Sequence, residues 1–352
     1  MFTKRSAKKS SIVGLDLDPS HLAAAEASVN GHVSVTKAAL TLLRPGVLRD
    51  GEVADAEALT QALRDLFTEH ELPTRVRLGV ANQRIVVRTL DLPPKLEDKA
   101  LQAAVALEAP DHIPMPMDEA ILDFQKVGIV ETPAGPRTRV VIVAVRREMV
   151  ETLISAATAA GLQVEGIDLS AFAMVRALAA PGDPARLYVN VSGLTNVAVA
   201  DCTGVFFART AVGGLDTLVH LLAERRSLTV EHARQWLGYV GLEAPLEQIE
   251  GDADVVGATR SVLEEGAGVI AEAIRGSLDY YRAQEGSQPV QEALLTGPAS
   301  AIPGFAERLS QHLGLPVARA AVATAPEAGS VTDADRLTVA AGLAVEERNL
   351  QR

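Results

Sequence analysis

The stretch IVGLDLDPSHLAAAEAS, from Ile12 to Ser28, contains two alternating apolar segments joined by a polar turn. This alternation predicts two antiparallel strands, because successive side chains of a strand point to opposite faces. A strand that ends in carboxylates, here Asp16 and Asp18, before a tight turn is typical of a phosphate-binding hairpin. The tip, however, has Asp18 and Pro19 where such a loop favours glycine and hydroxyl groups. The stretch therefore has the outline of a nucleotide-binding hairpin with altered chemistry.

A second copy of this pattern lies near the middle of the chain. RLYVNVSGLTNVAVADCTGVFFARTAVGG, residues 186–214, again predicts strand, polar loop, strand, turn and strand. The first copy continues through HVSVTKAAL (32–40), and Asn30-Gly31 predicts a two-residue hairpin turn before it. The distance between the copies is far longer than the period of a solenoid repeat. The pattern therefore indicates a duplicated domain.

The composition excludes several classes of protein. The chain has 352 residues, which is enough for two domains or one large two-lobed domain. Its net charge of -12 argues against a dedicated nucleic-acid-binding protein, which would normally carry a basic surface. The single cysteine, Cys202, excludes an internal disulfide framework and a cysteine-cluster metal site. No uninterrupted apolar run reaches the ~18 residues of a membrane helix, and the basic N-terminal segment lacks the apolar core of a secretion signal.

Periodic apolar positions predict amphipathic helices along the chain. The segment 57–70 has one such stripe, formed by Leu59, Leu63, Leu66 and Phe67. Pro93-Pro94 marks a boundary, and we expect the helix after it to bury one face made of Leu96, Ala100, Ala103, Ala104 and Leu107. Two strands joined by a turn around Ala134-Gly135 follow, and then a helix that Gly161 ends. This part of the chain is expected to form a compact α+β unit.

Several of these units together resemble one known family. LQAAVALEAPDHIPMPMDEAILDFQKVG, residues 101–128, is similar to the PilM family, in which a helix ending in Glu-Ala precedes an Ile-Pro-x-Pro loop and an acidic residue. Residues 140–178 fit the next unit of that family closely. The chain is identified as a member of the PilM family of type IV pilus assembly proteins, whose nearest functional relative is FtsA of bacterial division.

The resemblance implies an α/β protein with the duplicated actin/Hsp70-like ATPase fold. Two lobes with ribonuclease-H-like subdomains would carry an inserted α+β subdomain of the FtsA/PilM type, which is SHS2-like. The implied division is a basic flexible tail at 1–10, a first actin-like subdomain at 11–88 and 166–185, the insert at 89–165, a second actin-like subdomain at 186–215 and 290–352, and a helix-rich upper subdomain at 216–289.

The resemblance also implies ATP and Mg²⁺ in the cleft between the lobes. The nucleotide would be held by the first hairpin loop, its duplicate, a glycine pair before a helix, a helix of the upper subdomain and a late adenosine loop. The candidate nucleotide-binding residues are Asp16, Asp18, Ser20, Asn190, Ser192, Gly193, Thr195, Gly213, Gly214, Glu231, Gly297, Pro298 and Ala299.

Several of these positions depart from the family pattern, which is Asp-x-Gly-Ser-Ser-x-x-Lys in the first loop. Asp18 replaces the glycine, Ala23 replaces the lysine, and Pro19 removes an N–H donor. Asn190 replaces the aspartate of the second loop, and Pro298 replaces a glycine of the adenosine loop. A carboxylate beside phosphates is repulsive by roughly 1 kcal/mol or more. We therefore expect weak or degenerate ATP binding and no useful hydrolysis, while an active ATPase and a chain without a physiological nucleotide stay open as alternatives.

Other catalytic arrangements have less support. LDLDPS (15–20) resembles the Asp-x-Asp motif of haloacid-dehalogenase-type phosphatases, but the threonine and the later acidic pair that this chemistry needs are missing. His21, His112 and His220 are scattered, which favours structural roles over catalysis or metal binding. We therefore assign no catalytic residue and no metal-binding residue.

The resemblance implies a site for a protein partner. PilM-type proteins hold the short N-terminal cytoplasmic peptide of a membrane-anchored PilN-like protein, in a groove between the extra subdomain and its neighbour. An extended peptide gains affinity from main-chain pairing and a few apolar pockets. We expect the groove at residues 108–117 and 123–125, with Ile113, Met115 and Met117 as an exposed apolar rim, or alternatively buried beneath their own helix. The candidate groove residues are Glu108, Ile113, Pro114, Met115 and Phe124.

The expected function follows from these features. The chain is predicted to be a cytoplasmic scaffold of the type IV pilus inner-membrane platform, associated with the inner face of the membrane through its partners. Other platform components and a second copy of the chain are further expected partners, and nucleic acid is not. An FtsA-like role in cell division is a minor alternative, because the basic amphipathic helix expected near an FtsA C-terminus is not seen in the sequence.

Overall fold

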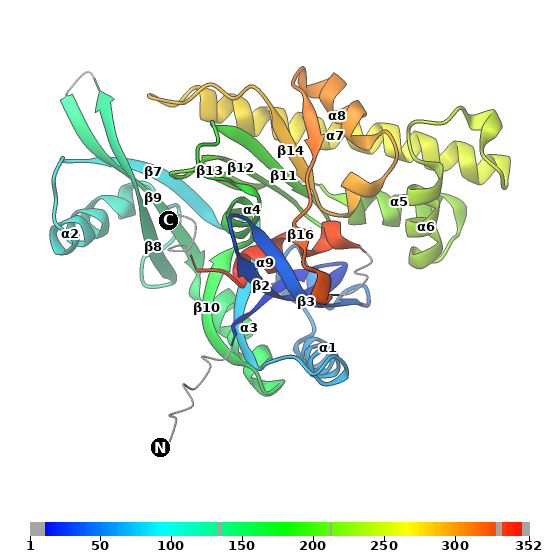
Figure 1. Ribbon diagram of the computed structural model, residues 1–352, viewed down its shortest axis with the longest axis horizontal. Helices are drawn as coiled ribbons and strands as arrows, with labels where there is room; N and C mark the ends of the chain where they lie inside the picture. Colours follow the sequence, from blue (N-terminus) through cyan, green and yellow to red (C-terminus); the bar gives the residue numbers. More distant parts are fainter. Residues whose placement is uncertain (1–10, 133–134, 212, 329–332, 347–352) are drawn as a thin grey trace.

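The computed structural model describes residues 11–132, 135–211, 213–328 and 333–346. Two lobes, each built on one β-sheet, lie against each other, and a smaller unit of three strands and one helix projects from the side (Figure 1). Within the described ranges, no helix has both the length and the apolar character needed to cross a bilayer.

The first lobe is built on a six-stranded sheet in the order β10-β6-β1-β2-β3-β16. Its central strand β1 pairs antiparallel with β2 and parallel with β6, so the β1–β2 turn lies at one end of the sheet. The apolar stripe of α1 and one side of α3 pack on this sheet, because their Leu and Ala side chains are buried there. The elements are β1 (Val13–Asp18), β2 (His21–Val29), β3 (Val33–Leu42), β4 (Leu48–Arg49), β5 (Glu52–Val53), α1 (Ala56–Glu69), β6 (Arg75–Val80), α3 (Arg147–Ala159), β10 (Gln163–Leu169) and β16 (Ala323–Thr324).

The second lobe repeats this topology. Its five-stranded sheet has the order β13-β12-β11-β14-β15, which matches β3-β2-β1-β6-β10 strand for strand, with parallel pairing in the last two steps of each. The duplication predicted from the two hairpin patterns is therefore confirmed. The elements are β11 (Arg186–Val191), β12 (Thr195–Asp201), β13 (Gly204–Ala211), α5 (Leu215–Arg226), α6 (Val230–Val240), α7 (Ala253–Arg282), β14 (Ala293–Thr296), α8 (Phe305–Leu313) and β15 (Val317–Arg319).

The projecting unit is an antiparallel sheet of order β7-β9-β8 with α2 on one face, at the left of Figure 1. Its elements are β7 (Val86–Leu92), α2 (Asp98–Glu108), β8 (Ala120–Thr132) and β9 (Gly135–Arg146). The predicted buried face of α2 is wrong: Leu101 and Val105 face the sheet, whereas Leu107 is 78% exposed. The helix is turned by about one residue relative to the prediction, because it must cover the apolar face formed by Leu90 and Ile142.

Two helices lie between the lobes and join them. α4 (Ser170–Leu178) and α9 (Thr338–Leu343) share a buried cluster with Tyr188 and Ala198 of the second sheet. They cross so closely that a Cβ atom on Gly342 would overlap the carbonyl oxygen of Ala173. Small residues at this crossing therefore set the spacing of the two lobes.

Two local predictions differ from the structure. The β2–β3 turn contains three residues, because Val29 pairs with Val33, so the two-residue turn predicted at Asn30-Gly31 is wrong. The turn predicted around Ala134-Gly135 lies partly outside the described residues. The boundaries expected at 89 and 165 stay predictions, although the side chains of α3 pack in the core of the first lobe.

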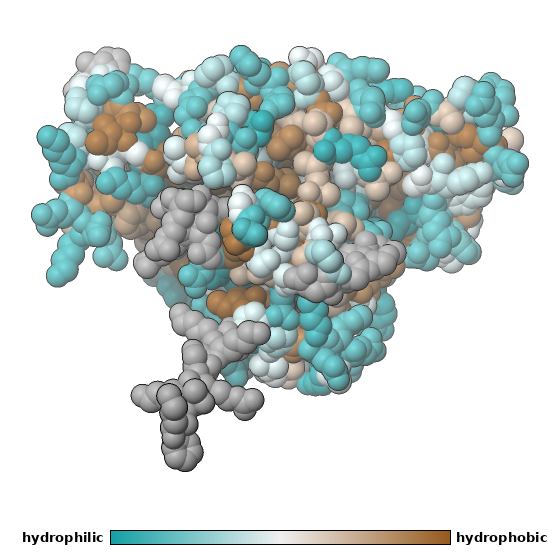
Figure 2. Space-filling model, in the orientation of Figure 1, coloured by the Kyte–Doolittle hydropathy of each residue, from teal (hydrophilic) through white to brown (hydrophobic). Residues whose placement is uncertain are grey.

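The surface drawn in Figure 2 is mostly hydrophilic, with a hydrophobic cluster over the end of the β8–β9 hairpin. Ile129 of β8 is 61% exposed. The large apolar clusters lie inside each lobe, inside the projecting unit and around α4 and α9. Buried polar side chains gather at the two hairpin tips, where Asp16, Asp18, Asn190 and Ser192 are each at most 7% exposed.

Candidate functional site

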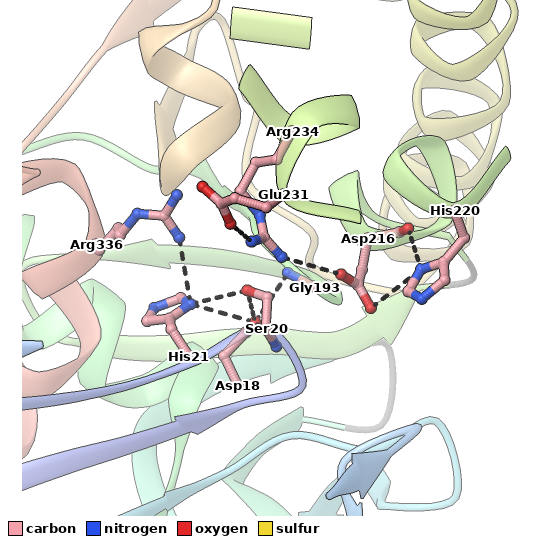
Figure 3. Close-up of polar contacts among 9 residues, drawn as sticks. All are labelled: Asp18, Ser20, His21, Gly193, Asp216, His220, Glu231, Arg234 and Arg336. Atoms are coloured by element: carbon pink, nitrogen blue, oxygen red, sulfur yellow. Dashed lines mark hydrogen bonds and ion pairs between the residues drawn. The ribbon is translucent and has the colours of Figure 1, made fainter. Parts of the chain in front are cut away.

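The two repeated hairpins face each other across the cleft, and the side chain of Asp18 joins them. Its carboxylate accepts hydrogen bonds from the backbone N–H of Gly193, at 3.0 and 3.2 Å, and from the backbone N–H of Ser20 at 2.9 Å (Figure 3). The hydroxyl of Ser20 donates a further bond of 2.6 Å to the same carboxylate. Asp18 therefore accepts hydrogen bonds from N–H groups of both loops. The family resemblance predicts that these two loops bind phosphate.

His21 and Arg336 complete the charge balance around Asp18. The Nδ1 atom of His21 lies 3.4 Å from the Asp18 carboxylate and 2.9 Å from the Ser20 hydroxyl. One terminal nitrogen of Arg336 lies 3.4 Å from the same His21 nitrogen. Burial by itself would raise the pKa of Asp18, but the charge of His21 and the hydrogen bonds from His21 and Ser20 outweigh it and lower the pKa to about 2. The carboxylate is therefore ionised and already compensated by protein groups.

Asp16 lies two residues before Asp18 on the same face of β1, and its pKa shifts in the opposite direction. It is buried, and the hydroxyl of Ser170 donates to it at 3.4 Å. Burial and the neighbouring charge of Asp18 raise the pKa of Asp16 to about 7. Near neutral pH much of this carboxyl group is protonated, which makes it a poor ligand for the water network of Mg²⁺.

The second loop contributes buried polar groups that lack partners. Asn190 Oδ1, Ser192 Oγ and Thr195 Oγ1 have no hydrogen-bond partner within the described part of the chain, and each residue is at most 5% exposed. A Cβ atom on Gly193 would lie 2.5 Å from the Asp18 carboxylate, so this position requires glycine for the close approach. Of the predicted residues of this loop, Gly193 lines the cleft and meets Asp18, whereas Asn190 and Thr195 lie on opposite faces of their hairpin.

The adenosine-loop residues and the upper subdomain border the same cleft. Gly297 has a φ of +84° beside Asn190, and Pro298 and Ala299 follow in a short buried 3₁₀ turn. Glu231 of α6 is half exposed and pairs with Arg234 at 3.1 Å, and Arg234 lies 3.8 Å from Asp216. Ion pairs of the chain itself therefore join α6 to Asp216 of α5.

The sequence analysis did not place four members of this network in the site. They are His21, Asp216, Arg234 and Arg336 (Figure 3). Asp216 had a local signal, because it occupies the first turn of a helix that begins right after Gly213-Gly214. Arg336 had none, since its approach to His21 joins residues that are 315 positions apart.

A cavity of about 600 Å³ opens between the lobes beside the hairpin tips. Pro19, Gly193, Gly213 and Asp216 line it, together with the segment 45–50 of the first lobe. Its volume would admit a nucleotide, but the lining residues do not fit a triphosphate with Mg²⁺. The Asp18 carboxylate already accepts a hydrogen bond from the Gly193 N–H, and Pro19 has no N–H to donate. Burial and the charge of Asp18 raise the pKa of Asp216. The arrangement favours hairpin tips that are joined to each other through Asp18 and Gly193 over tips that hold a triphosphate.

A second cavity lies between the projecting unit and the first lobe and has about 260 Å³. Ile121, Asp123, Phe124 and Gln125 of β8 line it opposite Ile167–Leu169 of β10 and Phe172 of α4. Glu108, Ile113, Pro114 and Met115 are not among its lining residues. We call this space the proximal cavity.

The expected exposed apolar rim is wrong: Ile113 is buried, as the alternative predicted, and Met115 and Met117 are half-buried. Ile113 is 5% exposed, and Met115 and Met117 pack with it against the α2 side of the sheet. The proximal cavity lies against the opposite face, because Ile121 and Asp123 alternate with Leu122 along β8. Phe124 is the one candidate groove residue that borders it.

Comparisons with known proteins agree with this architecture. The family model described as type IV pilus assembly protein PilM matches residues 14–235, which is more than half of the chain. The chain belongs to the PilM family. A solved PilM-PilN type IV pilus biogenesis complex contains a chain 25% identical to this PilM-family chain, with a TM-score of 0.78. The match covers 98% of this chain and 100% of that one.

Two more distant structures establish the fold of the PilM-family chain as actin-like. The ethanolamine utilization protein EutJ from Carboxydothermus hydrogenoformans is 16% identical with a TM-score of 0.52, over 95% of this chain and 88% of that one. MreB5 of Spiroplasma citri, solved bound to ADP, is 11% identical with a TM-score of 0.51, over 97% and 98%. At these identities the likeness concerns the fold alone.

Proposed function

We propose that this PilM-family protein is a scaffold of the type IV pilus inner-membrane platform that docks the N-terminal cytoplasmic segment of a PilN-like membrane protein in the proximal cavity. The observation that carries the proposal is the cavity itself, which lies where the projecting unit meets the first lobe. The similarity to a chain of a PilM-PilN complex supports the choice of partner. Docking of this kind would hold the protein at the inner face of the membrane.

The walls of the proximal cavity suit an extended segment. β8 is the last strand of the small sheet and β10 the last strand of the first-lobe sheet, so each has a free edge among the described residues. A free strand edge offers main-chain N–H and C=O groups to an added strand, and apolar side chains between the edges give specificity. Ile121, Val143 and Val145 supply apolar walls, and Asp123 and Asp168 supply charge.

Peptide binding tests this proposal. A fluorescent synthetic peptide with the N-terminal cytoplasmic sequence of the partner PilN should raise its anisotropy on titration with the protein. Val145→Glu places an unpaired charge in the cavity and should weaken binding at least about 10-fold. Leu107→Glu, on the exposed outer side of α2, is the matched control and should bind like the wild type. If the wild-type protein does not bind the peptide, the docking function is wrong.

ATP has at most a weak role on this proposal. The support is the Asp18 carboxylate, which takes the Gly193 and Ser20 amides and would have to leave before a phosphate entered. The favoured alternative is a nucleotide that sets the lobe angle without useful turnover. The buried oxygens of Asn190, Ser192 and Thr195, which lack partners among the described residues, support that alternative.

Calorimetry separates these cases. Mg-ATP titrated into the wild-type protein should give no binding heat, and Asp18→Gly should gain binding because the two amides are freed and a negative charge is removed. Binding by the wild type at micromolar strength would show that the altered loops still hold nucleotide; a hydrolysis assay would then test the active-ATPase alternative. Contacts with other platform components and with a second copy of the chain belong to the same proposal.

A further inference from the structure

A smaller cavity continues the proximal cavity toward the second lobe. It has about 80 Å³ and shares the lining residues Gln125 and Phe172 with the proximal cavity. Its other walls are the end of α4, the segment 179–181 and the β12–β13 turn from Asp201 to Val205. We call it the distal cavity. The shared residues show that the two cavities adjoin, and we call the pair the groove, whose walls extend from the edge strands β8 and β10 to the turn of the second lobe.

Arg176 is a buried cation in the wall of the distal cavity. The residue is 6% exposed, and its two terminal nitrogens both donate to Asp168. Its Nε atom has no hydrogen-bond partner among the described residues. The ion pair with Asp168 holds the guanidinium in place, and Arg176 is a fixed part of the wall of the distal cavity.

The groove as a whole is acidic. Its charged lining residues are Asp123, Asp168, Arg176 and Asp201, which are three carboxylates and one guanidinium. The guanidinium is already paired with Asp168. Among the described residues, the side chain of Asp201 bonds to Thr203 and Gln288, which carry no charge. Cytoplasmic segments next to membrane helices are enriched in Lys and Arg. The charge of the groove thus complements that of a membrane protein's cytoplasmic segment.

We propose that the distal cavity is a second subsite for the same partner segment. A Lys or Arg side chain of the segment pairs with Asp201. The proposal rests on the docking function above and extends it: the partner segment crosses from the proximal cavity to the second lobe. Binding of one segment would then contact both lobes of the scaffold.

The distal cavity carries its own chemical probe. Cys202 is the single cysteine of the chain, is exposed, and lines this cavity. The rate at which a thiol reagent such as dithiobis-nitrobenzoate modifies Cys202 therefore reports on occupancy of the distal cavity. Saturating PilN N-terminal peptide should slow this reaction at least about 10-fold, since a bound segment excludes the reagent from the thiol.

Two substitutions test the same contact independently. Asp201→Asn keeps the acceptor oxygen that Thr203 uses and removes the charge, so it should weaken peptide binding about two- to five-fold and reduce its salt dependence. Ala180→Trp fills the distal cavity and should lower the affinity for the full-length peptide. The lowered affinity should equal that of the wild-type protein for a peptide without the end that reaches this cavity. Glu151→Gln on the exposed face of α3 is the charge control and should change nothing.

The outcomes separate the two proposals. Protection of Cys202 together with weaker binding by Asp201→Asn and Ala180→Trp is the expected result. If the peptide binds, Val145→Glu abolishes binding, and Cys202 reacts at its free rate, then docking stands and the distal subsite is wrong. If the peptide does not bind the wild-type protein at all, both the docking function and the subsite are wrong.

Discussion

At the tip of the first hairpin, a carboxylate stands where the PilM-family pattern has a glycine. A carboxylate at this position would repel a phosphate. In the structure it contacts groups of the chain itself. Asp18 accepts hydrogen bonds from Gly193 and Ser20 and lies beside His21. An anion supplied by the chain therefore meets the donors that would otherwise face water or an external anion.

The first prediction at this scale concerns Asp18→Asn. Because the folded-state pKa of Asp18, about 2, lies below its ordinary value of 3.8, the carboxylate contributes stability above pH 4. The substitution should lower the free energy of unfolding by about 2 kcal/mol at pH 7, and the difference should vanish as the pH falls from 4 toward 2. Urea unfolding at several pH values measures this. Asp118→Asn, an exposed carboxylate in the loop after α2, is the control; an equal loss there would contradict the argument.

Asp16 gives a prediction of the opposite sign. Its folded-state pKa is raised from 3.8 to about 7, so its stability contribution is complete below pH 4 and is lost as the pH rises through 7. Asp16→Asn keeps a partner for Ser170 and removes the ionisation. It should therefore stabilise the protein, by about 2 kcal/mol more at pH 8 than at pH 5. A stability difference between variant and wild type that does not change with pH would show that Asp16 does not ionise in this range.

At the scale of the elements, close helix crossings and buried faces depend on which neighbour each helix meets. α1 buries the stripe that its own periodicity predicts, Leu59 to Phe67. α2 does not, because several small apolar positions on it are compatible with more than one face, and the sheet selects Leu101 and Val105. Helix periodicity therefore predicts a buried face well only where the apolar stripe is made of large side chains.

The crossing of α4 and α9 gives the prediction at this scale. Alanine is normally the better helix former, by about 1 kcal/mol over glycine. Gly342→Ala should nevertheless destabilise the protein, by about 1 to 3 kcal/mol, because the added Cβ overlaps the backbone of Ala173. Gly276→Ala, on an exposed part of α7 with nothing near the added Cβ, should stabilise it. Thermal unfolding of the two variants should shift in opposite directions; shifts of the same sign would show that crossing distance is not limiting.

At the scale of the whole molecule, the two lobes are joined in two places that are distant in sequence. α4 and α9 join them through an apolar cluster, and Asp18 joins the hairpin tips by hydrogen bonds across 175 positions of the chain. The contact through α4 and α9 is an apolar core of many residues. The contact through Asp18 is a small set of hydrogen bonds, which a single substitution can remove. The lobe angle should therefore be sensitive to the state of Asp18.

Amide exchange measures this coupling. In Asp18→Gly, the N–H of Gly193 loses its acceptor, and exchange in the segment 192–195 should become at least about 10-fold faster. The segment 253–282, which is α7 and far from the tips, should exchange as in the wild type. Equal acceleration in both segments would mean that the variant loosens the whole second lobe. Unchanged exchange in 192–195 would mean that Asp18 does not hold the cleft.

Short-range patterns in this sequence determined the elements and, through their repetition, the fold. The alternation of Ile12–Ser28 and of residues 186–214 encodes the two hairpins, because a strand's period of two is local. The stripe of Ile270, Ile274, Leu278 and Tyr281 likewise encodes the buried side of α7. Since the same hairpin pattern occurs twice, the duplication follows from the sequence pattern, and the resemblance to the PilM family added the two-lobed α/β architecture.

Only the tertiary structure decided what the candidate sites contain. Asp18 was recognised as a departure from a phosphate loop, but its bond to Gly193 and the approach of Arg336 to His21 join residues whose sequence separation carries no periodic signal. The peptide groove was expected beside Ile113, whereas the proximal cavity lies on the other face of the sheet, because the packing of α2 covers one face and leaves Ile121 and Asp123 on the other. Local propensity specifies elements, whereas the faces that remain open depend on how all of them pack.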